Sequence, residues 1–252
     1  MDQTLDALAA ETAGLSSFLE QLTDDQWRHP SACAGWSVSD VVLHLAQSEE
    51  GVISAFDHGS AGIPLAPYAK EAVSGGGGAV DGIVEAAVRA ERPTIPADVL
   101  PRWQEAHAGV MRRFREAEPG ARLNWISVPL SPRTLATTRI AEHWIHGMDI
   151  REPLGDPAPD TDRLELIARL AWRTLGYAFG SVGEVAPSVA LRLEGPEGEA
   201  WKFGSDDAEV VITGPAGDWC RVAARRLDPG ESSLIYEGTA GKRVLELVRT
   251  YA

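Results

Sequence analysis

Hydrophobic residues recur every three or four positions through much of the first 150 residues. This spacing is typical of amphipathic helices, which bury one face and leave the other in water. The first such stretch runs from Leu5 to Leu22, with acidic residues on the opposite face. Residues 80–92 and 97–118 repeat the pattern. The first half of the chain is therefore predicted to be helical.

Two further helices are predicted from their start signals. Ser37 and Asp40 have the spacing of a capping box, with Asp replacing the usual Glu, ahead of an apolar run that ends near Phe56. Ser131 followed by Pro132 is typical of an N-cap and a first-turn proline. Together these segments predict a four-helix bundle with one long connection, in a domain covering residues 1–155.

The pattern changes after a Pro-rich hinge at residues 155–160. Short alternating stretches typical of strands then appear among shorter helical segments. We expect helices at 161–178, 218–227 and 242–251, and strands at 189–194, 200–203, 209–213 and 234–237. Residues 156–252 are thus predicted to form a small α+β domain with an antiparallel sheet.

A Gly- and Pro-rich segment separates two of the predicted helices, from about His58 to Gly78. Its composition, including the run Gly75-Gly-Gly-Gly78, is typical of a mobile loop or lid. No strand precedes the run and no Lys-Ser/Thr follows it, so it does not match a phosphate-binding P-loop.

The charge balance excludes several classes of partner. A formal net charge of −14 repels nucleic acid and anionic lipid. Neither a membrane-spanning run nor a signal sequence is present, which predicts a cytoplasmic protein.

With only Cys33 and Cys220, a disulfide framework is not expected. Both are interpreted as small buried hydrophobes, although Cys33 could also be a nucleophile.

Candidate chemistry centres on the helix after Ser131. Glu142 and His146 lie four positions apart, so their side chains share one helix face. His44, in an apolar helical run, is the best candidate for a third metal ligand. Two histidines and one carboxylate leave a coordination position open, which is typical of a catalytic zinc site. The alternative is a buried salt-bridge network in which Arg139 and Arg151 pair with Glu142.

Other polar residues near this motif have two interpretations each. Asp149 could accept a hydrogen bond from a ligand imidazole, or be a surface carboxylate or arginine partner. His143 lies about 100° around the helix from Glu142, so we expect it to pack or to lie at the surface rather than bind metal. A basic cluster at 221, 225 and 226 could hold a carboxylate, or be a solvated helix face paired with acids.

Two segments carry a family resemblance. The segment from Trp27 through Gly35-Trp36 to His44-Leu45, together with residues 139–149, resembles the mycothiol-dependent maleylpyruvate isomerase family within the DinB-like metal-binding bundle superfamily. The segment Asp218-Trp-Cys-Arg221 and its flanking strands are similar to that family's smaller sterol-carrier-like domain. The resemblance spans nearly the whole chain.

The resemblance implies zinc bound by His44, Glu142 and His146, with mycothiol as thiol cofactor. It implies a metal-bound thiolate that adds to, or isomerises, a small carboxylated electrophile. One of the three C-terminal arginines would hold the substrate carboxylate. The resulting expected roles are catalytic for Arg221, Arg225 and Asp149, and cofactor-binding for Arg226 and Trp36.

Two other functions are compatible with the same ligands. The metal could activate water or polarise a carbonyl in a hydrolase, lyase or cyclase that needs no thiol. The chain could also be a non-catalytic metal- or ligand-binding protein. Two histidines and a carboxylate suit several divalent metals besides zinc. Either a monomer or a homodimer is compatible with the sequence.

Overall fold

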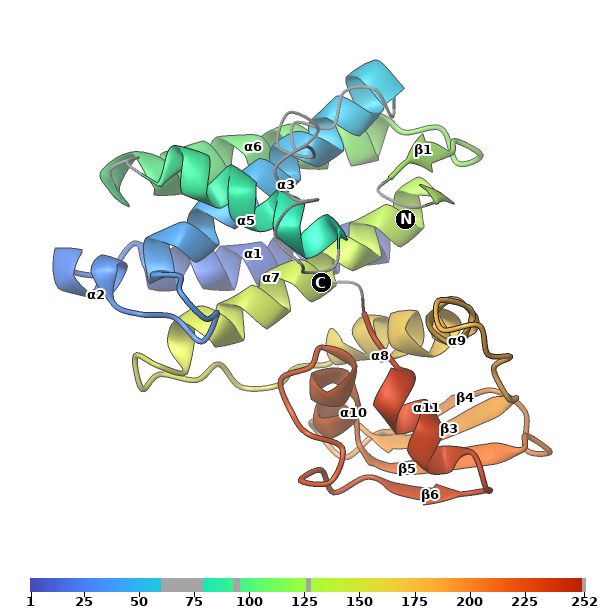
Figure 1. Ribbon diagram of the computed structural model, residues 1–252. Helices are drawn as coiled ribbons and strands as arrows, with labels where there is room; N and C mark the ends of the chain where they lie inside the picture. Colours follow the sequence, from blue (N-terminus) through green and yellow to red (C-terminus); the bar gives the residue numbers. More distant parts are fainter. Residues whose placement is uncertain (60–78, 93–95, 126–127, 251–252) are drawn as a thin grey trace. The chain divides into compact units, whose positions relative to one another are not determined.

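The protein is described by a computed structural model that covers residues 1–59, 79–92, 96–125 and 128–250 (Figure 1). Residues 60–78 of the predicted glycine-rich loop lie outside these ranges. The chain divides into two compact units. The helical unit comprises Met1–Ala136 and Glu142–Ala158, and the sheet unit comprises Thr137–Ala141 and Pro159–Ala252.

The helical unit is built on four long helices among its described residues. They are α1 (Asp2–Leu19), α3 (Val38–His58), α6 (Pro96–Glu116) and α7 (Pro132–Arg151) (Figure 1). Shorter elements are α2 (Asp24–Arg28), α5 (Ala79–Glu91) and the antiparallel pair β1 (Leu123–Asn124) and β2 (Pro129–Leu130). The predicted fold class is confirmed: a helix-rich N-terminal region precedes a small sheet domain.

The predicted start signals act as helix caps. The Ser37 backbone N–H donates to Asp40 Oδ2 at 2.9 Å, and the Asp40 N–H donates to Ser37 Oγ at 3.3 Å. Ser131 Oγ accepts from the Thr134 N–H at 3.2 Å, ahead of Pro132. The first helix was predicted to reach Leu22, but α1 ends at Leu19. Because Thr23 caps α2 with its own capping box, the chain starts a new helix there.

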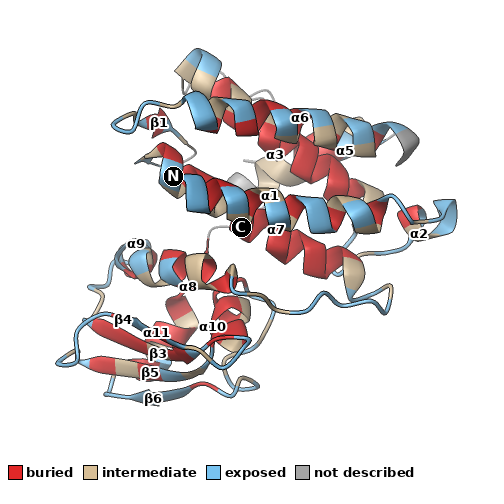
Figure 2. Ribbon diagram, turned by 180° about the vertical axis from the view of Figure 1, so that it is seen from behind, coloured by how far each residue is buried: buried red, intermediate tan, exposed pale blue. Residues whose placement is uncertain are grey.

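Figure 2 shows that buried positions cover most of α3 and the second half of α7. Apolar residues such as Leu15, Val41 and Trp103 fill part of this interior. Charged and polar side chains are buried with them, a costly arrangement unless each has a partner. These buried polar residues include His44, Glu49, Glu142, His143, His146 and Asp149. The bundle interior is therefore the candidate location of a functional site.

The sheet unit contains a four-stranded sheet and four short helices in its described residues. The strands are β3 (Val189–Glu194), β4 (Ala200–Phe203), β5 (Val210–Pro215) and β6 (Ile235–Glu237), in the order β4-β3-β5-β6. The helices are α8 (Leu164–Arg173), α9 (Leu175–Gly180), α10 (Ala216–Ala223) and α11 (Gly241–Leu247). The α10 and α11 helices lie against the sheet (Figure 1).

One strand pairing differs from the predicted antiparallel sheet. The β3–β4 and β5–β6 pairs are antiparallel, but β3 and β5 run parallel. The short connection after β4 passes the start of β3 and places β5 on its far side. Gly204 makes this passage with a φ of 77°, and a Cβ there would lie 2.4 Å from the Val189 carbonyl oxygen. Only glycine fits so close to the neighbouring backbone.

Two predicted helices of this unit are divided or shortened. The stretch 161–178 forms α8 and α9, which meet at Thr174 with φ −90° and ψ 0°. Among the described residues, the helix predicted at 242–251 ends at Leu247. The break at Thr174 lies inside the predicted helix, whereas the second correction lies at a helix end, where the sequence pattern is least decisive.

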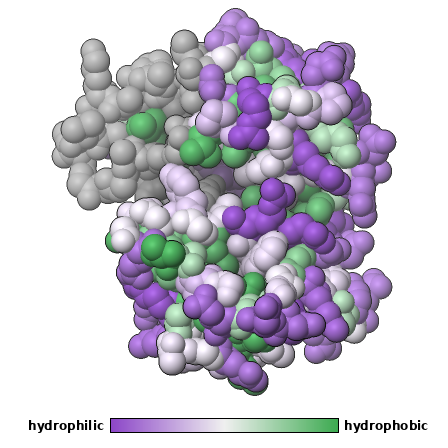
Figure 3. All heavy atoms as spheres, turned by 90° about the vertical axis from the view of Figure 1, so that its right-hand side faces the viewer, coloured by the Kyte–Doolittle hydropathy of each residue, from purple (hydrophilic) through white to green (hydrophobic). Residues whose placement is uncertain are grey.

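The surface agrees with the charged composition. On the face shown in Figure 3, hydrophilic residues are interspersed with smaller hydrophobic patches. Within the described residues, no helix has the length and apolar character needed to cross a membrane.

Candidate metal centre

Helices α3 and α7 bring the three predicted ligands together. His44 Nε2 lies 3.6 Å from Glu142 Oε2, and His146 Nε2 lies 3.6 Å from the same oxygen. The two imidazole rings meet edge to face, with centroids 4.9 Å apart. All three residues are buried, with exposed fractions of 9% for His44 and 6% for Glu142 and His146.

These separations suit shared coordination better than hydrogen bonding. An N–H···O hydrogen bond is usually 2.7–3.2 Å long, shorter than either contact. Bonds of about 2.1 Å to one tetrahedral ion place its ligand atoms roughly 3.4 Å apart. Two imidazoles and a buried carboxylate are also a donor set that divalent transition metals prefer. The residues present therefore fit a divalent metal.

Asp149 orients one of the imidazoles. Its Oδ2 lies 2.9 Å from His146 Nδ1, and its side chain is only 1% exposed. If His146 Nδ1–H donates to this carboxylate, Nε2 carries the lone pair and faces Glu142. Ligating histidines usually have such an oxygen partner on the other ring nitrogen. The contact is the one predicted for Asp149, and its part in catalysis stays a prediction.

Cys33 lies next to this pair, although the sequence favoured a simple packing role for it. Its loop lies against the end of α7, because the Ala32 N–H donates to the Asp149 carbonyl oxygen at 2.8 Å. Cys33 Sγ is 3.1 Å from Asp149 Oδ2 and 3.9 Å from His146 Nδ1. The only sequence signal for this placement was the position of Cys33 just before the His44 helix.

The indole ring of Trp36 lies beside the His44 imidazole. The two ring centroids lie 5.5 Å apart at an angle of 52°. The indole Nε1–H donates to Glu85 Oε2 on α5 at 2.6 Å, which fixes the ring in place. The structure thus places Trp36 beside His44, and its contact with a cofactor stays a prediction.

In the salt-bridge alternative, Arg139 and Arg151 were the proposed partners of Glu142. Arg151 is paired elsewhere. Arg151 pairs with Asp156 at 3.2 Å and stacks over Phe18, with its guanidinium carbon 4.2 Å from the ring centroid. The guanidinium is therefore engaged away from Glu142. Arg139 is buried on α7, one turn before Glu142.

The three C-terminal arginines have different surroundings. Arg221 forms a bidentate pair with Asp160, at 2.7 and 2.8 Å. This pair lies over Gly217, where a Cβ would be 2.2 Å from Asp160 Oδ2. The fit indicates a structural role for Arg221, which competes with its predicted role toward substrate.

Arg225 and Arg226 lie beyond α10, whereas the sequence predicted a helix through residue 227. The helix ends at Ala223 because Arg225 adopts a left-handed conformation, with φ 62°. The Arg226 N–H donates to the Arg221 carbonyl and the Arg225 N–H to the Val222 carbonyl, at 2.9 and 3.1 Å. This is a Schellman cap, in which glycine usually occupies the left-handed position.

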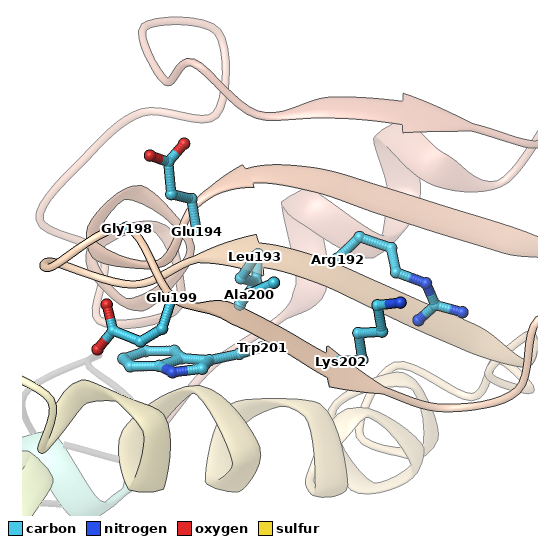
Figure 4. Close-up of a pocket in the computed structure, with 8 residues that line it drawn as sticks. All are labelled: Arg192, Leu193, Glu194, Gly198, Glu199, Ala200, Trp201 and Lys202. Carbon is cyan, nitrogen blue, oxygen red and sulfur yellow. The ribbon is translucent and has the colours of Figure 1, made fainter.

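A separate pocket of about 280 Å³ lies on the β3–β4 hairpin (Figure 4). Arg192 and Lys202 lie toward one end, and Glu194 and Glu199 toward the other. Arg192 also pairs with Asp206. None of the predicted site residues lines this pocket, so the pocket is not part of the candidate metal centre.

Comparison with known proteins identifies the family of the chain. The family described as "Mycothiol maleylpyruvate isomerase N-terminal domain" matches residues 8–151, which include every residue of the candidate metal centre. The chain belongs to this family. Two relatives are both 28% identical over 249 residues, covering 97% of this chain and 93% of their own length. They are the uncharacterized proteins MT0041 and Rv0036c of Mycobacterium tuberculosis, strains CDC 1551 / Oshkosh and ATCC 25618 / H37Rv.

Solved structures show the same fold. The crystal structure of the mycothiol-dependent maleylpyruvate isomerase matches with a TM-score of 0.60 and 17% identity, over 94% of this chain and 92% of that one. A point mutant of that enzyme matches with a TM-score of 0.58 and 17% identity, over 90% and 89% of the two chains. The shared architecture therefore extends across both units.

Proposed function

We propose that this protein is a metal-dependent enzyme that uses mycothiol to isomerise, or to transfer the thiol to, a small carboxylated electrophile. The observation that carries the proposal is the convergence of His44, Glu142 and His146 at ligand spacing. The family membership adds mycothiol as the thiol and maleylpyruvate as a first substrate to try. Zinc is the first metal to test, since the ligand set suits it.

The residues around the centre support this chemistry. When bound, a divalent metal would supply the positive charge that keeps a thiol ionised near neutral pH. Asp149 holds the His146 ring so that Nε2 faces the centre. Trp36 supplies an apolar surface next to His44, suited to the packing of a cofactor. The Cys33 thiol contacts Asp149 Oδ2 and would contribute to the hydrogen bonding of that carboxylate.

For the substrate carboxylate we propose Arg225 first. Arg221 is engaged by Asp160, and one Arg226 nitrogen donates to the Ala224 carbonyl oxygen at 2.9 Å. Arg225 retains a left-handed backbone that costs energy for a side chain, and such strain is often kept at functional positions. Arg226 remains the proposed cofactor contact.

The test is an activity assay with maleylpyruvate, with and without mycothiol, on zinc-loaded protein. His44→Ala and His146→Ala should lose the metal ion of this centre and lower the rate more than about 100-fold, since even outer partners of ligands contribute roughly 10- to 100-fold. His58→Ala is the matched control, because His58 is exposed on the same helix as His44. It should keep wild-type metal content and rate.

Other results of these assays would favour one of the alternative functions or contradict the ligand assignment. Metal-dependent activity without mycothiol, on this or a hydrolysable substrate, would favour the thiol-independent enzyme and contradict the thiol part of the proposal. Unchanged metal content in both histidine variants would show that the ligands are wrong. Metal bound at wild-type ligands with no turnover of maleylpyruvate or related electrophiles would favour a binding protein.

A further inference from the structure

A second group of histidines and a glutamate is buried in the helical unit, and no step above uses it. Glu49 comes from α3, His107 from α6 and His143 from α7. Glu49 and His143 are fully buried, and the His107 side chain is 15% exposed. His107 Nδ1 lies 3.4 Å from Glu49 Oε2, and His143 Nε2 lies 3.7 Å from Glu49 Oε1.

The donor set repeats that of the first centre. Both groups contain two histidines and one glutamate, and both are joined by contacts between α3 and α7. In the first group α3 contributes the histidine His44, whereas in the second it contributes the glutamate Glu49. The separations of 3.4 and 3.7 Å bracket the 3.6 Å found in the first group. Both are close to the roughly 3.4 Å expected between ligands of one tetrahedral ion.

Hydrogen bonds assign the ring nitrogens of His107. The Thr12 hydroxyl donates to the Leu8 carbonyl oxygen at 2.9 Å, so it accepts from His107 Nε2–H at 3.0 Å. The lone pair of a neutral His107 is then on Nδ1, which is buried and makes no hydrogen bond among the described residues. An oxygen partner on one nitrogen and a free lone pair on the other is the usual arrangement of a metal-binding histidine.

His143 also presents a lone pair toward this point. The indole of Trp103 can only donate, and its Nε1 lies 3.0 Å from His143 Nε2. His143 Nε2 is therefore an acceptor, the form that ligates metal. A bound ion would compete with the Trp103 indole for this lone pair.

We infer that Glu49, His107 and His143 form a second metal site that takes one divalent transition-metal ion of the Zn²⁺ type. The site joins α3, α6 and α7 in the bundle interior. Because its glutamate and one histidine are fully inaccessible, the ion would stabilise the fold rather than meet substrate. This inference is independent of the proposed function, since none of the three residues belongs to the first centre.

The test is the metal content of zinc-loaded, desalted protein in a four-way comparison. Wild type should hold two equivalents of zinc, His44→Ala one, His107→Gln one, and the double variant none. One equivalent in wild type, none in His44→Ala and one in His107→Gln would overturn the second site. One equivalent in wild type that persists in His44→Ala and is lost in His107→Gln would support the second site and contradict the first.

Two further measurements keep the test decisive if His107→Gln does not fold. Zn²⁺ should raise the thermal midpoint of His44→Ala, because a ligand that binds only the folded state stabilises it. Adding Trp103→Phe to His44→Ala should tighten Co²⁺ binding several-fold, since the competing N–H is removed. Absence of both a midpoint shift and Co²⁺ binding in His44→Ala would overturn the inference, because only a buried ion pair would then hold these residues.

Discussion

The two units of this protein use their interiors differently. Among the described residues, nearly all buried polar and charged side chains belong to the helical unit, including two groups of histidine and glutamate. The interior of the sheet unit is almost entirely apolar, with Trp219, Ile212 and Leu191 at its centre. Its charges are paired nearer the surface, as in the Arg243–Glu184 and Arg221–Asp160 pairs.

The difference favours the helical unit as the location of the candidate site. A buried charge destabilises a fold unless a partner or an ion compensates it, so selection for stability alone favours an apolar interior. The sheet unit follows this rule except at Arg139 and Thr250, each 2% exposed. The helical unit departs from it at His44, Glu142 and His146, and again at Glu49 and His143. We therefore expect mutations in the two interiors to affect different measurements.

The largest expected effect on stability is in the sheet unit. Trp219 is fully buried on α10, and its indole donates to the Ala168 carbonyl oxygen at 3.2 Å. Trp219→Ala should lower the free energy of unfolding by about 3–5 kcal/mol, because it leaves a large cavity and removes this hydrogen bond. Urea titration followed by circular dichroism measures this change.

Val185→Ala is the control in the same unit, since Val185 is 93% exposed. It should change the free energy of unfolding by less than about 0.5 kcal/mol. Where Trp219→Ala is still folded, its zinc content should equal that of wild type, because all proposed ligands belong to the helical unit. Loss of zinc from folded Trp219→Ala would contradict the claim that the helical unit alone holds the zinc ligands.

A smaller effect is expected from Asp149→Asn in the helical unit. The substitution keeps the size of the side chain but removes the charge that holds His146 Nδ1–H. Zinc affinity at the first centre should fall about 10- to 100-fold. Competition with a chromophoric chelator gives the affinity, and a His107→Gln background isolates the first centre.

Asp156→Asn is the matched control for loss of one negative charge. Asp156 belongs to the same unit, pairs with Arg151 and is 63% exposed. Its removal should leave zinc affinity within about twofold of wild type, because exposed charges are screened. Equal losses in the two variants would show that Asp149 acts through net charge rather than by orienting His146.

The smallest expected effect is a gain of stability at Arg225. This residue occupies the left-handed position of the α10 cap, with φ 62°. Arg225→Gly should raise the free energy of unfolding by about 1 kcal/mol, since glycine adopts this conformation without steric cost. If Arg225 holds the substrate carboxylate, the same variant should raise KM.

Arg226→Gly serves as its neighbour control. Arg226 has no left-handed backbone to relieve, and the change removes its hydrogen bond to the Ala224 carbonyl. It should be neutral or slightly destabilising. Equal stability of Arg225→Gly and Arg226→Gly would contradict the strain argument, and an unchanged KM in Arg225→Gly would remove it from substrate binding.

Local patterns in the sequence predicted much of the fold. Ser37 with Asp40, and Ser131 with Pro132, marked two helix starts that the structure confirms, because capping depends on residues within one turn. Strands 189–194 and 200–203 also agree with the structure. The parallel β3–β5 pairing was missed, since the direction of a strand depends on where the connection after Gly204 passes.

For the site, the sequence by itself determined only what one helix can arrange, and it named His44 of another helix as a candidate partner. The spacing of Glu142, His146 and Asp149 places them on one face of α7, since an α-helix has 3.6 residues per turn. The tertiary structure decided which residues of other elements join them. Cys33 contacts Asp149 because its loop lies against the end of α7.

The structure also shows that His143 lies beside residues of other helices, which the sequence of its own helix could not predict. It meets Glu49 and His107 only because α3, α6 and α7 pack together, so a residue interpreted as packing became a candidate ligand. Helical periodicity depends on the local backbone. Coordination by separate helices depends on how their buried faces fit, and that fit is a property of the whole bundle.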